Sequence, residues 1–362
     1  MKRLGMKTGK LGLVAIAAVA ALSLVSCGGG GSTAEGGNAT GVIGAGSSFD
    51  NPLFSKMFSV YHDSTKIQVN YQSVGSGAGI SQLTHKTIDF GASDAPMNEE
   101  QSKAVEGEVL HIPVTAGAVV ISYNLPDFKG DLKFTPAIVA DIFLGKITKW
   151  NDPAIAAANP GLTLPATDIV VAHRSDGSGT SAIFTSYLSK VSTEWESKVG
   201  TGTSVNWPVG LGGKGNEGVS GLIKQTPGGV GYIELAYANQ NQMPYASIQN
   251  KAGNFIVPSI ESVTAAADIE IPQDGKVLLT NTDAAQGYPI SGFSWVLIYK
   301  EQSYNKRTEA QAQQLLTLLS WMIHTGQQYS AALDYAPLSQ AAVATGDALL
   351  KSATFNGQQI LK

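Results

Sequence analysis

Two long runs of β-branched and aromatic residues, GAVVISYN (117–124) and FSWVLIYK (293–300), lie far apart in the sequence. Such runs are typical of buried β-strands. Strand-like and helix-like segments alternate before, between and after them, which predicts an α/β fold. An economical arrangement crosses from one lobe to a second through the first run and returns through the other. We therefore expect two lobes joined by two hinge-crossing strands, with a cleft between them; a single large α/β domain is the alternative.

The N-terminus has the composition of an export signal. A basic segment, MKRLGMKTGK, precedes the apolar segment LGLVAIAAVAALSLVS, which is too short to span a membrane comfortably. Small residues before Cys27 resemble the lipobox of bacterial lipoproteins, and no other cysteine in the chain offers a disulfide partner. We expect a lipoprotein signal peptide over 1–27, a flexible Gly/Ser tether over 28–40 and a folded body outside the cytoplasmic membrane. An ordinary secretory signal with an incidental cysteine is the alternative.

The bulk composition limits the classes of partner. The 362 residues carry a net charge of −4, and only 14% of them are charged. The chain therefore lacks the excess of basic residues that nucleic-acid binding requires.

Three segments share one design, in which an apolar strand leads through a Gly/Ser turn into an amphipathic helix. They are GAGSSFDNP (44–52), VGSGAGIS (74–81) and RSDGSGTSAIF (174–184). A helix N-terminus has unpaired N–H groups, glycine allows a ligand to approach the backbone, and Ser or Thr adds a hydroxyl. Each segment alone is also an ordinary helix cap, but the three together favour an anion-binding site.

Charged residues accompany two of the strand ends. Arg174 offers a planar cationic fork for an oxyanion, and Asp176 is placed to orient it, although a surface ion pair is the alternative. Asp94, in FGASDAP (90–96), would repel a bound anion unless the anion carries a proton to donate. A protonated phosphate does so and sulfate does not, so Asp94 predicts phosphate selectivity if it lines the site. A polar turn is the alternative.

The motifs of common enzymes do not fit this sequence. Gly177 and Gly179 flank Ser178 directly, so a nucleophile elbow is not formed. The segment GLGGKGNEG (210–218) lacks the Ser or Thr that follows the lysine of a P-loop. The five histidines show no metal-ligand spacing, and only His173 is placed to border the site. We expect neither a cofactor nor a metal.

The chain resembles the phosphate-binding proteins of bacterial phosphate-specific (Pst) ABC transporters over 41–350. The resemblance rests, in this order, on GAGSSF, NYQSVGSGAG, DFGASDAPM, DIFLGKITKWNDPAI, RSDGSGTSAIFTSYL and WPVGLGGKGNEGV. It implies a two-lobed periplasmic-binding-protein fold of type II, the Venus flytrap, which closes on one phosphate ion. We expect lobe 1 to comprise 41–117 and 291–362, and lobe 2 to comprise 118–290.

The resemblance also implies a role for each site residue. Arg174 is the cationic clamp, held by Asp176, and Asp94 accepts the phosphate proton. The implied donors of hydroxyl or backbone N–H groups are Ser48, Phe49, Ser76, Ser178, Gly179 and Thr180. Two positions depart from the family pattern: Ser48 replaces a common threonine, and His173 replaces an arginine found in some relatives.

We therefore expect a monomeric, lipid-anchored binding protein that delivers inorganic phosphate to an ABC permease for import. An extracytoplasmic phosphate sensor or a surface adhesin with the same fold is the alternative. A secreted phosphatase that uses Ser178 is a further one, and it lacks a recognisable base or metal.

Overall fold

The structure is a computed structural model and describes residues 41–361. Cys27, the signal peptide expected over 1–27 and the tether expected over 28–40 lie outside these residues. Within them, no helix combines the length and the apolar character needed to cross a lipid bilayer.

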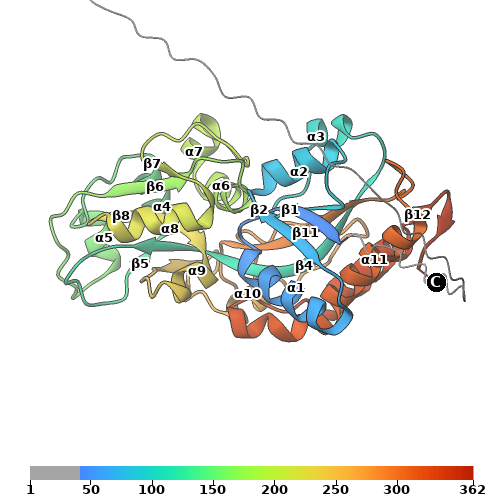
Figure 1. Ribbon diagram of the computed structural model, residues 1–362. Helices are drawn as coiled ribbons and strands as arrows, with labels where there is room; N and C mark the ends of the chain where they lie inside the picture. The colour runs from blue at the N-terminus through green and yellow to red at the C-terminus, as the bar shows by residue number, and fades with distance from the viewer. Residues whose placement is uncertain (1–40, 362) are drawn as a thin grey trace, which may run out of the picture. The chain divides into compact units, whose positions relative to one another are not determined.

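One eight-stranded sheet organises the chain, and its strand order is β2-β1-β3-β11-β4-β8-β6-β7. Several neighbours in this order lie far apart in the sequence, β11 beside β3 and β4 above all, so the sheet brings distant segments together (Figure 1). The strands are β1 (Val42–Gly46), β2 (Val69–Ser73), β3 (Phe90–Ser93), β4 (Val109–Tyr123), β6 (Val170–Arg174), β7 (Leu211–Gly213), β8 (Gly229–Glu234) and β11 (Ser291–Tyr299).

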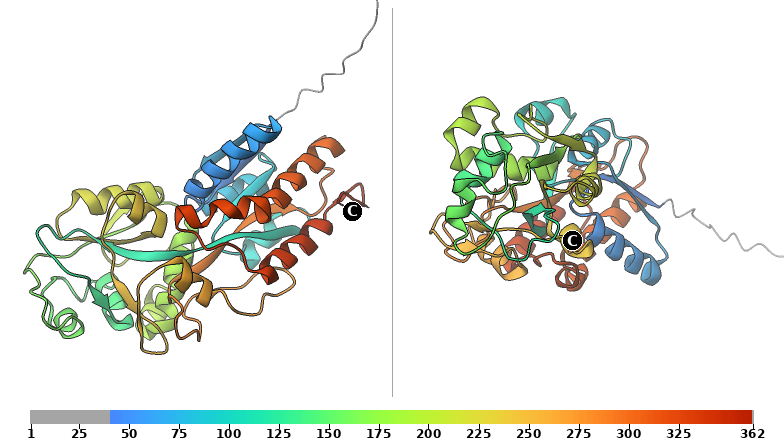
Figure 2. Two further views of the ribbon diagram at one scale, coloured as in Figure 1. Left: turned by 90° about the horizontal axis from the view of Figure 1, so that it is seen from below. Right: turned by 90° about the vertical axis from the view of Figure 1, so that its left-hand side faces the viewer.

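Strand β4 belongs to both halves of the sheet. It pairs antiparallel with β11 from Val109 to Ala118, and antiparallel with β8 from Val119 onward. In Figure 2 this long strand runs from one half of the protein into the other. The chain returns beside it, because the Val119 N–H donates to the carbonyl of Ile290, the residue before β11. Nearly every residue of β4 is buried, which explains its apolar composition.

The first half contains the parallel strands β2, β1 and β3, followed by the antiparallel β11 and part of β4. Its helices are α1 (Asn51–Thr65), α2 (Ser76–Thr84), α3 (Glu99–Ala104), α11 (Glu309–Ile323) and α12 (Gln340–Lys351). Helix α1 buries one face, formed by Leu53, Phe54, Met57, Phe58 and Tyr61, as its helical spacing predicts.

The second half contains β8, β6 and β7, with helices α4 (Pro136–Phe143), α5 (Pro153–Ala158), α6 (Gly179–Val191), α7 (Thr193–Lys198), α8 (Gly215–Gln225) and α9 (Leu235–Gln240). Its core is aromatic: the ring of Phe184 lies 4.6 Å from that of Phe143 and 4.5 Å from that of Tyr232.

The remaining elements are β5 (Lys133–Phe134), β9 (Ser247–Gln249), β10 (Phe255–Ile256), α10 (Ile260–Ala266), the 3₁₀ helices η1 (Thr325–Tyr329) and η2 (Ala331–Leu333), β12 (Thr354–Phe355) and β13 (Gln358–Gln359).

Helix α2 packs on the sheet at a glycine. A Cβ atom on Gly79 would lie 2.6 Å from both the carbonyl oxygen of Ala45 and the Cα of Gly46, which are backbone atoms of β1. Backbone atoms cannot move aside as a flexible side chain can, so this helix must carry glycine here to lie so close to β1.

We expect Gly79→Ala to lower the free energy of unfolding by about 1–3 kcal/mol, because the added methyl group overpacks this contact. Gly221→Ala is the matched control, since Gly221 is also inside a helix and its Cβ would meet nothing within 4 Å. The control should be neutral or stabilising by up to about 1 kcal/mol. Urea denaturation of both variants measures the difference, and equal stabilities would contradict the packing argument.

Candidate oxyanion-binding site

The functional side chains predicted from the sequence follow the carboxyl ends of strands in both halves. Ser48 follows β1, Ser76 follows β2 and Asp94 follows β3. Arg174 ends β6 and is followed by the turn that leads into α6. Ligands of open α/β sheets bind at the carboxyl ends of the strands. The topology therefore brings these residues to one place.

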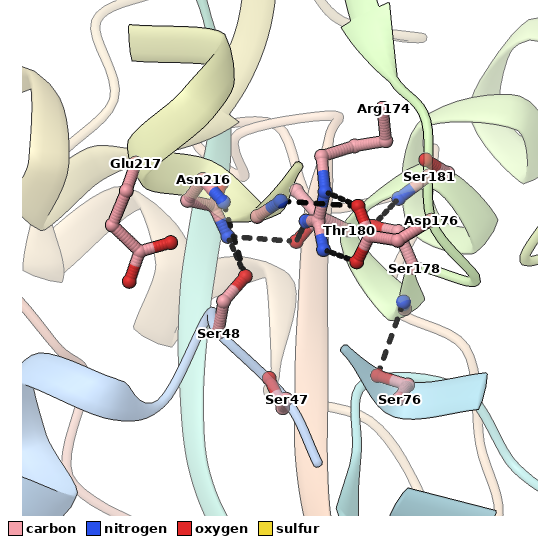
Figure 3. Close-up of polar contacts among 12 residues, drawn as sticks. Ser47, Ser48, Ser76, Arg174, Asp176, Ser178, Thr180, Ser181, Asn216 and Glu217 are labelled. Atoms are coloured by element: carbon pink, nitrogen blue, oxygen red, sulfur yellow. Dashed lines mark hydrogen bonds and ion pairs between the residues drawn. The ribbon is translucent and has the colours of Figure 1, made fainter. Parts of the chain in front are cut away.

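The loops of the two halves touch each other at this place. The Ser76 hydroxyl accepts hydrogen bonds from the N–H of Gly179 (3.1 Å) and of Asp94 (3.3 Å), and Figure 3 shows the contact at Ser76. The Gly77 N–H donates to the carbonyl of Gly177 at 2.9 Å. A Cβ on Gly179 would lie 2.6 Å from Asp94 Oδ2, so this acid lies beside the N-terminus of α6.

Arg174 is held by a carboxylate two residues away. Its Nε and Nη2 donate to the two oxygens of Asp176 at 2.8 and 2.6 Å, and its side chain is only 1% exposed. Burial tends to raise the pKa of Asp176, but the hydrogen bond and charge of Arg174 lower it below its ordinary value. Nη1 remains directed to the Thr180 hydroxyl at 3.4 Å. The pair fixes the plane of the guanidinium and leaves one edge of it for other partners.

Asn216 is a further member of the site and was not among the residues predicted from the sequence. It follows β7, and its Nδ2 donates to the Ser48 hydroxyl at 3.0 Å and to the Thr180 hydroxyl at 3.1 Å (Figure 3). Its Oδ1 accepts from the N–H of Glu234 at 3.0 Å, which fixes the orientation of the amide. The signal was present in the sequence, because the segment 210–218 has the same strand, glycine turn and helix as the other three.

Three hydroxyls of the site have both of their acceptor positions filled by N–H groups. Ser48 accepts from the backbone N and from Nδ2 of Asn216, and Ser76 accepts from Gly179 and Asp94. Thr180 accepts from Arg174 and Asn216. A hydroxyl has one hydrogen and two acceptor positions. Each of these three therefore keeps its hydrogen to donate, as an oxyanion site requires.

Asp94 is the buried acid of the cluster. Its Oδ1 accepts hydrogen bonds from the hydroxyls of Ser47 (2.5 Å) and Ser294 (2.9 Å), neither of which was among the residues predicted from the sequence. Burial raises the pKa of Asp94 to about 6, although these hydroxyls and the charge of Arg174 lower it. An acid of this kind is ionised at neutral pH and accepts a proton from a ligand readily.

The other predicted residues occupy different positions around the cluster. The Ser178 hydroxyl caps α6, accepting from the Ser181 N–H at 3.0 Å. Phe49 is buried, and its carbonyl accepts from the Tyr335 hydroxyl at 2.6 Å. His173 precedes Arg174 on β6, where successive side chains point to opposite faces. Its ring stacks on Trp207 with centroids 5.0 Å apart.

Comparison with known proteins places this arrangement in a class. A model of the PBP superfamily domain matches residues 31–325. The solved structure of a phosphate-binding protein from Stenotrophomonas maltophilia has the same fold, with a TM-score of 0.65 at 18% identity, and the match covers 86% of this chain and 93% of that one. The phosphate-bound periplasmic protein PfluDING gives a TM-score of 0.66 at 20% identity over 84% of this chain and 92% of that one. The protein is a two-lobed α/β protein of the periplasmic-binding type.

Sequence relatives narrow the class further. The phosphate-binding protein PstS of Pasteurella multocida is 46% identical over 306 residues, which cover 83% of this chain and 87% of that protein. PstS of Xylella fastidiosa strain Temecula1 is 47% identical over 302 residues, which cover 82% of this chain and 81% of that protein. The chain therefore belongs to the family of PstS phosphate-binding proteins.

The raised pKa of Asp94 predicts a pH dependence of stability. An acid whose pKa is higher in the folded than in the unfolded protein favours folding at low pH. For Asp94 this contribution is complete below its unfolded pKa of 3.8 and is lost as the pH rises through about 6. We expect the Tm of the ligand-free protein to fall over this interval, and to fall less in Asp94→Asn.

Thermal unfolding in phosphate-free buffers at several pH values measures this difference. Asp127→Asn, which removes an exposed carboxylate from a turn, is the control and should behave like the wild type. Parallel Tm profiles for the wild type and Asp94→Asn would show that burial does not act on Asp94 in this way.

Proposed function

We propose that the protein binds inorganic phosphate outside the cytoplasmic membrane and delivers it to an ABC permease for import. The observation that carries this proposal is the set of hydroxyls at Ser48, Ser76 and Thr180, whose acceptor positions are filled and whose hydrogens are left to donate to an oxyanion. Membership of the PstS family and the position of Asp94 beside α6 support phosphate as that oxyanion.

In this proposal each element of the site has a separate task. The guanidinium of Arg174 and the N-terminus of α6 at Ser178, Gly179 and Thr180 neutralise the charge of the ion. The backbone at Ser48 and Phe49 and the Ser76 hydroxyl bind it from the other half. Asp94 accepts the hydrogen that phosphate carries and sulfate lacks, so sulfate would place its charge against an unpaired carboxylate.

We propose that lobe 1 comprises 41–117 and 291–362 and that lobe 2 comprises 118–290. The change of β4 partners after Ala118 supports the first boundary, and the bond between Val119 and Ile290 supports the second. Contacts between Ser76 and Gly179 and between Ser48 and Asn216 join the two lobes. A ligand held by both lobes favours this closed arrangement over an open one.

We also propose that a lipid on Cys27 anchors the protein to the membrane, that 28–40 is its tether, and that the protein acts as a monomer. The basic and apolar segments before Cys27 support the anchor. Binding without catalysis is supported by Ser178, whose hydroxyl serves as the helix cap of α6 rather than facing a general base.

We expect Arg174→Ala to weaken phosphate binding about 30-fold or more, because truncating one member of a buried charge pair costs about 2–5 kcal/mol. Arg307→Ala is a matched control, since Arg307 is also buried against a carboxylate, that of Asp89. This control also removes a buried arginine from an ion pair, but neither Arg307 nor Asp89 is a proposed ligand contact. Calorimetric titration with phosphate should show the loss in Arg174→Ala alone, and equal affinity in that variant would remove the clamp from the proposal.

We expect Asp94→Asn to reduce the preference for phosphate over sulfate. The amide can donate a hydrogen to a sulfate oxygen, whereas the carboxylate repels it. Competition by sulfate and by arsenate against bound phosphate measures the preference. Arsenate shares the shape and protonation of phosphate and should compete with both proteins, whereas sulfate should compete effectively only with the variant. The same weak sulfate competition in both proteins would place Asp94 outside the selective contact.

A further inference from the structure

A second buried carboxylic acid, Asp50, lies close to Asp94 and has no role in the function proposed above. Asp50 follows Phe49 and precedes α1, and its side chain is completely buried. The Ser294 hydroxyl lies between the two acids, 2.5 Å from Asp50 Oδ2 and 2.9 Å from Asp94 Oδ1. This bridge from Asp50 through Ser294 to Asp94 joins the loop after β1, the end of β3 and the middle of β11.

The number of hydrogens in this bridge decides the protonation of the acids. The Ser294 hydroxyl has one hydrogen, so it donates to only one of the two carboxyl groups. The other contact is a hydrogen bond only if that carboxyl group is protonated and donates to the Ser294 oxygen. One of the two acids therefore holds a proton.

The surroundings assign this proton to Asp50. Asp94 also accepts from the Ser47 hydroxyl and is attracted by Arg174, which favours its ionised form. Asp50 has no cationic neighbour of this kind, and its Oδ1 has no hydrogen-bond partner among the described residues. A buried carboxylate without such partners is costly, whereas the neutral acid is not.

The ionisable groups that act on Asp50 point the same way. Burial and the charge of Asp94 raise the pKa of Asp50 well above its ordinary value, and the hydroxyls of Ser294 and Ser47, which act to lower it, do not offset this rise. Glu234, Tyr71 and Tyr335 also interact with it electrostatically, and all of them are acidic groups. Each of these neighbours is neutral or negative, so none favours an ionised Asp50.

We propose that Asp50 is a permanently protonated positioning residue that determines ligand specificity by directing the Ser294 hydroxyl onto Asp94. Asp50 donates to Ser294, and Ser294 donates to Oδ1 of Asp94. Oδ1 is thereby occupied by two hydroxyls, and Oδ2, beside the N-terminus of α6, is left to accept a hydrogen from the ligand. This relay of hydrogen bonds, from Asp50 through Ser294 to Asp94, selects an oxyanion that carries a proton. This inference rests on the proposed function.

The relay explains why one serine alone would not suffice. The carbonyl of Ser93 also lies 3.3 Å from the Ser294 oxygen and competes for its hydrogen. Without a donor at position 50, the Ser294 hydroxyl is free to turn away from Asp94. The pKa of Asp94 would then rise, and a protonated Asp94 cannot accept the ligand's hydrogen.

The experiment compares variants that keep and remove the donor. Asp50→Asn places an amide donor at Ser294 and cannot ionise, whereas Asp50→Ala has no donor. We expect Asp50→Ala to bind phosphate about tenfold more weakly at neutral pH, as for loss of a hydrogen bond to a charged group. Its affinity for sulfate, which brings no hydrogen to Asp94, should fall by a smaller factor. Asp50→Asn should recover most of the lost affinity. Ser294→Ala should match Asp50→Ala, and the double variant should lose no more than either.

Calorimetric titrations across the pH range provide a second readout. Loss of the relay should shift the midpoint at which phosphate binding is lost on acidification to a higher pH in Asp50→Ala and Ser294→Ala, but not in Asp50→Asn. A change of stability alone would not shift this midpoint. Wild-type affinity for all three single variants, or equal losses in Asp50→Asn and Asp50→Ala, would overturn the proposal.

Infrared spectroscopy tests the protonation without any ligand. The wild type at neutral pH should show a band of a protonated carboxyl group that is lost in Asp50→Asn and retained in Asp89→Asn. This test also covers the case in which Asp50→Ala does not fold. Absence of a difference between Asp50→Asn and the wild type would overturn the inference. Failure of the wild type to bind phosphate would instead overturn the proposed function and leave the infrared result to decide the protonation.

Discussion

The two halves of this protein meet main chain against main chain, and the site depends on that close approach. A Cβ on Gly77 would lie 3.1 Å from the Cα of Gly177, and a Cβ on Gly75 would lie 2.4 Å from a carboxylate oxygen of Asp176. The glycines after the strands therefore do more than expose helix N-termini to a ligand. They allow two loops from different halves to exchange hydrogen bonds directly, which is the close approach that the proposed contact of one ion with both halves requires.

The charges of the side chains at this contact, those of Arg174 and Asp176, nearly cancel. Arg174 provides one positive charge, and Asp176 is ionised because it shares two hydrogen bonds with it. The pair is then nearly neutral, and the partial charge at the N-terminus of α6 becomes the main attraction for an anion. A second free carboxylate would oppose binding in a site so well shielded from water. An ionised Asp94 is therefore compatible with a bound anion only when that anion brings a hydrogen to it.

The fold and much of the site follow from local sequence patterns. The apolar runs, the helical spacing in α1 and the Gly/Ser turns before α2 and α6 depend on neighbouring residues, so the sequence reveals them. Asn216 was within reach, because its segment repeats the same pattern, and the strand position of His173 next to Arg174 already implies opposite faces. The bridge from Asp50 to Ser294 joins residues 244 positions apart. Such a pair is set by the sheet order, and no local pattern indicates it.

Asp50 illustrates why a residue's local role can hide its function. In the sequence it precedes α1, where an acidic residue is an ordinary helix cap. In the structure its side chain makes no such cap and turns inward to Ser294. A carboxylate at a helix N-terminus is normally stabilised by the helix dipole, yet complete burial beside Asp94 acts against its charge. The side chain that the helix would favour as an anion is thus held as a neutral donor, because the nearest site for a negative charge is already occupied by Asp94.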